Sequence, residues 1–178
     1  MKRAFEVRAA TRADLPTIMD FQLSMARETE GLDLDVDKVT AGVEGPFADP
    51  SLARYYVASS SSSSAVAGSP SDCGGLTSPT NDDHVVAGML MVTFEWDEEH
   101  DGLFYWIQSV YTRPAYRGVG VFKQLYAFVA SEVGNNADAL GIKLYAHHDN
   151  ERAVRTYERL GLRVYEGAQM WKWMKGRY

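Results

Sequence analysis

The segment that decides the fold reads RPAYRGVGVF and occupies residues 113–122. It follows a stretch rich in β-forming residues and precedes an apolar pattern of helical period, which predicts a turn from a strand into a helix. Gly118 and Gly120 allow the backbone to approach a ligand closely and to adopt positive φ. The unpaired N–H groups and the dipole at the start of the helix favour an anion, and Arg117 adds a charged donor. The segment therefore predicts a phosphate-binding turn.

The neighbouring residues exclude two other kinds of phosphate-binding motif. A P-loop is excluded because no Gly-Lys-Ser or Gly-Lys-Thr follows. The dinucleotide-binding fingerprint lacks its third glycine, and the preceding strand belongs to a predicted hairpin. An ordinary strand-to-helix turn that contains two glycines stays open as an alternative to the anion site when this segment is taken alone.

A second segment, at residues 148–162, carries a candidate acid. Asp149 or Asn150 can cap a helix that starts directly after them. On that helix Asn150, Ala153 and Tyr157 fall on one face at helical spacing. The small Ala153 side chain lets a ligand lie close, and the Tyr157 hydroxyl on the same side could donate a proton. The alternative is that the Tyr157 ring packs in the core with its hydroxyl at the edge.

The rest of the chain predicts a single domain with a mixed order of strands and helices. We expect strands at residues 5–9, 54–58, 84–96, 103–112 and 142–146, with short strands at 164–165 and 170–174. We expect one helix that Asp14 caps and Pro16 begins, and others at residues 36–43, 121–133 and 151–160. The signals that should end these last three helices are Gly45-Pro46, Gly134-Asn135-Asn136 and Gly161.

Length, composition and charge restrict the class of protein. The chain has 178 residues, of which 46% are hydrophobic and 24% charged, as in a globular domain. The formal net charge of -6 argues against a main role on nucleic acid and suits a cationic or amine-bearing partner. Cys73 is the only cysteine, so no internal disulfide can form. The sequence also lacks a signal-peptide pattern and an apolar run of about 20 residues, so we expect a cytoplasmic protein without a membrane partner.

Residues 59–83 are dominated by Ser, Gly, Pro, Asn and Asp. Such a segment cannot bury enough apolar surface to offset the entropy lost on ordering, so we expect a flexible loop between two strands. A loop of this length is unusual inside a compact domain. We favour a tolerated surface insertion over a substrate lid.

Together, the segments at residues 113–122 and 148–162 resemble the central motifs of the GNAT superfamily of N-acetyltransferases. Motif A of that family has the form Arg/Gln-X-X-Gly-X-Gly/Ala after a strand, and here Arg117-Gly118-Val119-Gly120 supplies the arginine and the first motif glycine. Motif B has Asn, Ala and Tyr before Leu-Gly-Phe, and here these are Asn150, Ala153, Tyr157 and Leu160-Gly161-Leu162. The resemblance covers nearly the whole chain outside residues 59–83.

Two letters depart from the family pattern. Phe122 stands at the last small position of motif A. Its backbone N–H could still bind phosphate, while its ring either narrows the pyrophosphate pocket or packs inward. Leu162 stands in place of Phe, which is a conservative change in a core.

The resemblance implies an α/β (α+β) fold with a mixed, mostly antiparallel central sheet, a parallel V-shaped splay between its fourth and fifth strands, and about four flanking helices. It implies that the co-substrate acetyl-CoA lies in that opening, with its pantetheine paired to backbone groups as an added strand would be. The residues that it assigns to cofactor binding are Val110, Tyr111, Thr112, Arg117, Gly118, Val119, Gly120, Val121, Phe122, Asn150, Ala153 and Tyr157. Tyr157 is also the candidate general acid, which protonates the departing CoA thiolate.

The catalytic base is left open by the sequence. The acceptor amine must lose a proton, and Glu95, at the distal end of the long strand, is our first candidate to take it. Asp101, His100 and Glu28 are rivals, and for any single one of the four candidates a solvated charge near a turn is the favoured alternative.

Aromatic and histidine residues near this region have alternative explanations. The aromatic residues are Trp96, Tyr105, Trp106 and Tyr111, which could wall a substrate pocket, contact a cation, or simply pack in the hairpin. His147 and His148 are adjacent, and adjacent residues of a strand face opposite sides, so they cannot easily chelate one ion. We expect no metal.

The sequence therefore predicts an N-acetyltransferase that moves an acetyl group from acetyl-CoA to a primary amine by direct attack in a ternary complex. The acceptor could be a polyamine, an amino acid, a drug-like amine or a peptide, and the acidic stretch at residues 28–37 favours a cationic one. The alternative is a catalytically silent CoA-binding sensor or scaffold, because a fold can outlive its chemistry. A regulatory partner protein has no specific feature in its favour. We expect a monomer or a homodimer.

Overall fold

The computed structural model describes residues 4–61, 84–146 and 149–164. The chain divides into two units, Met1–Leu144 and Tyr145–Tyr178, and each is described by itself. Several predictions lie outside the described residues: most of the predicted loop, Cys73, the pair His147 and His148, and nearly all of the two C-terminal strands. No helix in the described ranges is long and apolar enough to cross a membrane.

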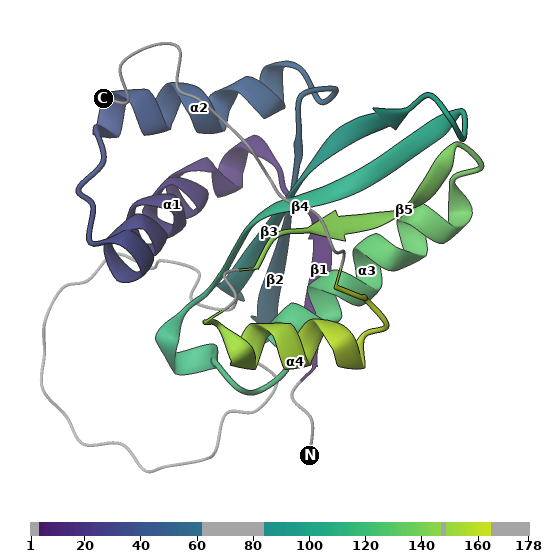
Figure 1. Cartoon of the computed structure of the whole chain (residues 1–178). Coiled ribbons are helices and arrows are strands. Elements are labelled where there is room, and N and C mark those ends of the chain that lie inside the picture. The colour runs from purple at the N-terminus through teal and green to yellow at the C-terminus, as the bar shows by residue number, and fades with distance from the viewer. Residues whose placement is uncertain (1–3, 62–83, 147–148, 165–178) are drawn as a thin grey trace, which may run out of the picture. The chain divides into compact units, whose positions relative to one another are not determined.

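Within the described part of the first unit, five strands form one sheet in the order β1-β2-β3-β4-β5 (Figure 1). The strands are β1 (Phe5–Ala9), β2 (Arg54–Ser61), β3 (His84–Asp97), β4 (Gly102–Thr112) and β5 (Ala139–Leu144). The first three neighbouring pairs are antiparallel, and β4 pairs with β5 in parallel. This confirms the predicted mixed, mostly antiparallel sheet with a parallel pair at its fourth and fifth strands.

Helices cover both faces of the sheet (Figure 1). One face carries α1 (Leu15–Glu30) and α2 (Val36–Ala48), and the other carries α3 (Val121–Asn135). The alternation of strand residues explains the two cores, because successive side chains point to opposite faces. Met89 of β3 packs toward α1, whereas its neighbour Leu90 packs toward α3, and both are fully buried.

A β-bulge changes the register between β3 and β4. Met91 pairs with Ser109 but Val92 pairs with Ile107, so Gln108 is an extra residue on β4. Because side chains alternate with a period of two, the extra residue decides which side chains of β4 face α1 and which face α3. Bulges often occur next to active sites, where they direct a side chain.

Two predicted helix signals act differently in the structure. Helix α2 continues through Gly45 and Pro46 to Ala48, whereas we predicted an end at this pair. A proline disfavours the helical conformation of the residue before it through a clash with that residue's Cβ, and Gly45 has none. Asp14 precedes α1, but its side chain does not cap that helix. It accepts hydrogen bonds from the Arg8 guanidinium at 2.7 and 2.8 Å instead.

Strand β2 continues further than the sequence indicated. We assigned residue 59 onward to a loop, but Ser59 and Ser60 belong to β2 and pair with Val86 and Val85. Both serine residues are buried. The ladder hydrogen bonds to β3 thus override the low strand preference of a serine-rich run, as tertiary context often does.

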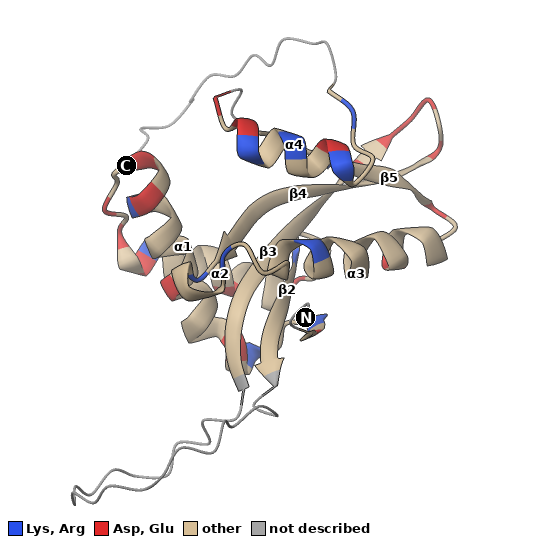
Figure 2. Ribbon diagram, turned by 90° about the horizontal axis from the view of Figure 1, so that it is seen from below, with Lys and Arg blue, Asp and Glu red and all other residues tan. Residues whose placement is uncertain are grey.

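The second unit contains α4 (Glu151–Arg159). The Asn150 side chain accepts a hydrogen bond from the Ala153 N–H at 3.2 Å and so caps the helix, as predicted for this segment. Gly161 adopts φ 93°, a left-handed conformation that suits the glycine stop after the helix. Figure 2 shows that basic and acidic residues both occur along α4.

A close contact joins β3, the end of β4 and the start of α3. Gly88 pairs with Thr112 in register. A Cβ atom at Gly88 would lie 2.7 Å from the Tyr111 carbonyl oxygen and 2.9 Å from Cγ1 of Val121. The missing side chain therefore lets β4 and the first turn of α3 lie against β3, which positions the glycine turn between them.

We expect Gly88→Ala to lower the free energy of unfolding by about 1 to 3 kcal/mol, since its close neighbours are backbone and a buried side chain. Gly42→Ala in α2 is the matched control, because no atom lies within 4 Å of the added methyl group. That control should raise stability by up to about 1 kcal/mol through helix propensity. Urea unfolding followed by circular dichroism measures both. Equal unfolding midpoints for the two variants would show that the contact at Gly88 is not tight.

Candidate functional site

The glycine turn after β4 has the geometry of an anion site. A 3-10 turn at Pro114–Tyr116 is followed by Gly118 with φ 79° and Gly120 with φ 95°. Both angles lie in the left-handed region that side chains disfavour, so the two glycines are required by the backbone path. Gly120 is also the N-cap residue of α3. The predicted strand–turn–helix unit is confirmed.

The backbone N–H groups of this turn are available to a ligand. In the described part of the chain, the N–H groups from Gly118 to Val121 donate no hydrogen bond. The first N–H groups of a helix have no intrahelical acceptor and lie at the positive end of the helix dipole. A phosphate group fits these donors, which are its preferred partners at such a terminus.

The edge of β4 beside the turn is open along its second half. Parallel pairing with β5 ends at Ile107 and Leu144, whereas β4 continues to Thr112. Beyond Ile107, no strand among the described residues pairs with this edge. Val110, Tyr111 and Thr112, the predicted pantetheine partners, lie on this segment. An extended ligand can therefore add to β4 as a strand would.

The side chain of Arg117 makes contacts within the protein. Its guanidinium donates to the Thr112 carbonyl oxygen at 2.9 Å and to the Glu28 carboxylate at 2.5 Å. Glu28, at the end of α1, also accepts from the Tyr111 hydroxyl at 2.8 Å. The hydrogen bonds from Arg117 and Tyr111 lower the pKa of Glu28, so its carboxylate stays ionised at neutral pH. Arg117 thus ties the glycine turn to β4 and α1.

Two other predicted binding residues direct their side chains into the core. Phe122 packs against the α3 core and lies 6.1 Å from the Tyr126 ring, centroid to centroid. Of the two orientations that we considered for its ring, the structure thus has the inward one. Val110 packs against the same core. Only the backbone groups of these two residues can therefore contact a phosphate or a pantetheine.

In the second unit, the predicted residues lie on α4 and at its start. Asn150 caps the helix through its side-chain oxygen, which leaves its amide N–H₂ group as a possible donor to a ligand. Ala153 and Tyr157 follow at helical spacing and are partly buried. Burial raises the pKa of the Tyr157 hydroxyl, so this group is protonated at neutral pH, as a general acid must be.

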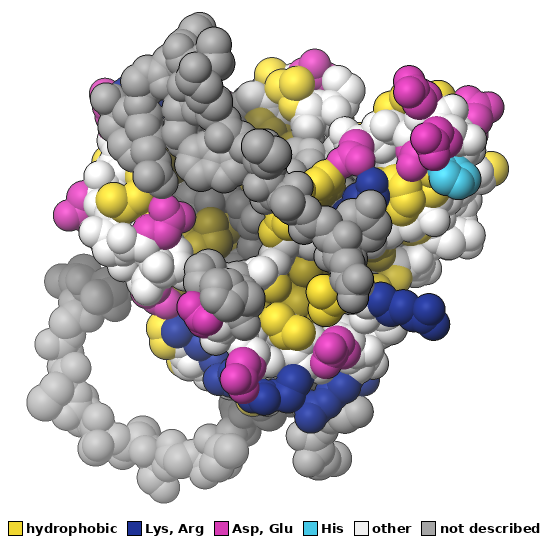
Figure 3. All heavy atoms as spheres, in the orientation of Figure 1, with side chains coloured by type: hydrophobic (Ala, Val, Ile, Leu, Met, Phe, Trp, Pro, Cys, Tyr) yellow, Lys and Arg dark blue, Asp and Glu magenta, His cyan; other side chains and the backbone are white. Residues whose placement is uncertain are grey.

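Three of the base candidates, Glu95, His100 and Glu28, have charged partners. The Glu95 carboxylate lies 2.7 Å from the Lys143 ammonium on β5. His100 is 2.9 Å from Asp97 in the β3–β4 turn, and this hydrogen bond lowers the pKa of Asp97. Acidic side chains gather around a histidine at this turn (Figure 3). Glu28 is held by Arg117 of the glycine turn, which lies at the other end of β4 from the β3–β4 turn.

Lys143 was not identified from the sequence. It is the polar residue in an otherwise apolar strand, which marks it as facing away from the α3 core, but its partners come from β3 and β4. Its ammonium lies 3.9 Å from the centroid of the Phe104 ring and 5.9 Å from that of Trp106. Trp106 therefore contacts a cation, one of the outcomes that we considered for the aromatic residues of this hairpin.

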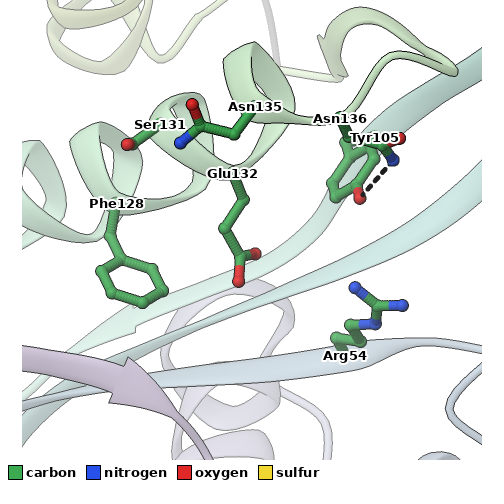
Figure 4. A pocket seen from close by; sticks show the side chains of 7 residues that line it. All are labelled: Arg54, Tyr105, Phe128, Ser131, Glu132, Asn135 and Asn136. Carbon is green, nitrogen blue, oxygen red and sulfur yellow. Dashed lines mark hydrogen bonds between the residues drawn. The ribbon is translucent and has the colours of Figure 1, made fainter.

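A cavity of about 450 Å³ lies between the C-terminal half of α3 and strands β2 and β4 (Figure 4). Glu132 points from α3 toward the sheet, where it accepts a hydrogen bond from the Tyr56 hydroxyl. Asn136 donates to the Tyr105 hydroxyl at 3.3 Å. The cavity is lined by Arg54, Tyr105, Phe128, Ser131, Glu132, Asn135 and Asn136. Apart from Tyr105, no predicted site residue lines it, and it is on the opposite face of the sheet from α1.

The described residues contain no group of three or more His, Cys, Asp or Glu side chains that could hold a metal ion. The histidine pair that we considered for this role lies outside the described ranges.

Comparison with known proteins agrees with this geometry. Residues 48–162 match the model of the acetyltransferase (GNAT) family. No curated protein matches the sequence. A solved structure of a possible acetyltransferase from Clostridium difficile 630 is 29% identical, with 97% of this chain and 99% of that chain covered and a TM-score of 0.75.

Two more distant structures share the fold. AAC(6')-Iy, in complex with the bisubstrate analogue CoA-S-monomethyl-acetylneamine, is 15% identical, with 97% of this chain and 99% of that chain covered and a TM-score of 0.68. A ribosomal-protein-alanine N-acetyltransferase from Brucella melitensis biovar Abortus 2308 is 13% identical, with 96% and 99% covered and a TM-score of 0.66. Because the family match spans more than half of the chain and includes both the glycine turn and α4, this protein belongs to the GNAT acetyltransferase family.

Proposed function

We propose that this protein is an N-acetyltransferase that moves an acetyl group from acetyl-CoA to a primary amine, by direct attack in a ternary complex. The observation that carries the proposal is the pair of glycines in left-handed conformation, directly after a strand whose edge has lost its parallel partner. Hydrogen-bond donors for a phosphate thus lie next to an open strand edge. A ligand with a pyrophosphate and an extended amide arm requires both features side by side.

In this proposal, acetyl-CoA binds mainly to backbone groups of the first unit. The N–H groups of residues 118–121 hold the pyrophosphate, since the Arg117 N–H that we also predicted for this role donates to the Pro114 carbonyl oxygen at 3.2 Å. The edge of β4 at Val110, Tyr111 and Thr112 pairs with the pantetheine arm. The Arg117 guanidinium keeps the turn in place through Glu28 and Thr112. From the second unit, Asn150 and Ala153 contact the pantetheine region.

The chemical step transfers one acetyl group and moves two protons. The neutral amine nitrogen attacks the thioester carbonyl carbon, the new C–N bond forms, and the C–S bond breaks to release a thiolate. Tyr157 donates its proton to that thiolate, which the raised pKa of its hydroxyl permits across the neutral range. Glu95 takes the proton from the amine, and its present partner Lys143 must then move away from the carboxylate.

The acceptor is proposed to be cationic. The two distant structures that share the fold differ in acceptor, since one holds an analogue with acetylneamine and the other is named for an alanine of a ribosomal protein. The acceptor must therefore be argued from this chain. Acidic residues dominate the stretch 28–37 and the β3–β4 turn, and a negative surface attracts a protonated amine.

The second candidate is a CoA-binding sensor or scaffold without turnover. It shares the glycine turn and the open edge of β4 with the enzyme, so binding of acetyl-CoA alone does not separate the two. A role for Tyr157 in turnover separates them, because a binding module has no use for a proton donor.

The first test is calorimetric titration with acetyl-CoA. We expect micromolar binding by the unaltered protein, and affinity lower by roughly tenfold for Gly120→Ala, because a side chain at positive φ costs about 1 to 2 kcal/mol or shifts the turn. Gly134→Ala near the end of α3 is the control, with no atom within 4 Å of the added methyl group, and should bind as the unaltered protein does. No binding at millimolar acetyl-CoA would contradict the proposal.

The acid is tested with Tyr157→Phe. General acid catalysis contributes about 10² to 10⁴ in rate, so we expect kcat to fall by at least roughly a hundredfold while acetyl-CoA affinity changes little. Asn150→Ser keeps an oxygen for the helix cap but removes the amide, and should weaken acetyl-CoA binding instead. Steady-state kinetics and calorimetry measure the two effects. Full turnover by Tyr157→Phe would show that another group protonates the thiolate.

A further inference from the structure

The side chain of Lys143 occupies a site built for an ammonium group. Its Nζ lies 2.7 Å from Oε1 of Glu95 and 3.9 Å from the centroid of the Phe104 ring. The Trp106 ring centroid lies 5.9 Å from the same nitrogen. A carboxylate together with aromatic faces is the combination that attracts an alkylammonium ion, by charge and by the ring quadrupoles.

The strand registers bring these groups to one face of the sheet. Glu95 pairs directly with Phe104 across β3 and β4, and Trp106 pairs with Lys143 across β4 and β5. Gly141 makes room for one of the rings, since a Cβ atom there would lie 3.2 Å from Cε1 of Phe104. The site therefore depends on three strands and on a glycine.

The site is open to solvent and adjoins the free edge of β4. The side chains of Lys143 and Glu95 keep 36% and 40% of their exposure, so an outside amine can reach the carboxylate. Parallel pairing ends at Ile107, one residue beyond Trp106. If the pyrophosphate lies at the start of α3, the pantetheine arm runs back along β4 toward Gln108, and its thioester end lies nearest to this site.

We infer that Glu95, Phe104 and Trp106 form the acceptor subsite, and that Lys143 holds the place of the acceptor until it binds. The inference rests on the proposed acetyltransferase function and names its substrate class: a primary amine on an unbranched alkyl chain, as in a linear polyamine or a lysine side chain. The arriving ammonium displaces Lys143 and pairs with Glu95. Glu95 takes one proton from it and passes that proton to solvent, which leaves the neutral amine. The carboxylate is then free to take the second proton as the amine attacks the thioester.

The test is calorimetric titration with spermidine and, separately, with Nα-acetyl-lysine amide. Lys143→Met keeps the length of the side chain but removes the competing charge. We expect it to bind at least one of the two amines roughly tenfold more tightly than the unaltered protein, about the effect of one cation–π contact with one partly exposed ion pair. The amine whose affinity increases more on this substitution shows whether the acceptor is a polyamine or a lysine side chain.

Two controls isolate the effect of the site. Lys38→Met removes the same charge and also frees a carboxylate, since the Lys38 ammonium lies 4.0 Å from Asp35. Unlike Lys143, Lys38 contacts no aromatic ring in the described part of the chain. The Lys38→Met variant should bind amines as weakly as the unaltered protein. Lys143→Arg retains a cation at the site and should behave likewise. Adding Glu95→Gln to Lys143→Met should abolish the gain.

Equal affinities of Lys143→Met and Lys38→Met for both amines would overturn the inference, as would a gain that survives Glu95→Gln. Thermal unfolding of each variant verifies that it is folded. Titration of the same samples with acetyl-CoA distinguishes the two proposals. Normal acetyl-CoA binding without an amine gain overturns the subsite alone, whereas no acetyl-CoA binding by the unaltered protein overturns the proposed function.

Discussion

The arrangement of the site depends on how far along β4 its pairing with each neighbouring strand extends. Its antiparallel pairing with β3 extends to Thr112, but its parallel pairing with β5 ends at Ile107. The chain leaves β4 through the glycine turn, passes through α3 and returns as β5, so the open edge and the free N–H groups lie at the same end of the same strand. Gly88 permits this by letting the end of β4 approach β3 closely.

The charged side chains around the site serve mainly to hold its backbone. Arg117 links the turn to the Thr112 carbonyl oxygen and to Glu28, and Glu28 in turn accepts from Tyr111. The hydrogen bonds of this group join α1 to β4 and to the turn, which lie 83 and 89 positions later in the sequence. A phosphate site made of N–H groups needs such support, because backbone donors are effective only when their directions are held.

The two faces of the sheet have different chemistry. On the α3 face, hydrogen bonds join Tyr56 to Glu132 and Asn136 to Tyr105 beside the cavity. On the α1 face, Lys143 and Glu95 form an ion pair over aromatic rings and remain partly exposed. An exposed ion pair contributes little to stability, and in our proposal this one marks the acceptor subsite. The bulge at Gln108 lies two residues beyond Trp106 on β4, where it changes the direction of the β4 side chains.

The sequence by itself determined the features that depend on neighbouring residues: the left-handed glycines of the turn, a cap of α4 at Asp149 or Asn150, and the order of strands and helices with its mixed sheet. These follow from local backbone preference and from the period of the apolar pattern. The tertiary structure decided what the charges contact and where the parallel pairing ends. Arg117 meets a glutamate 89 positions away, and Lys143 meets one 48 positions away. Such partners are set by strand register and helix packing, which no local pattern encodes.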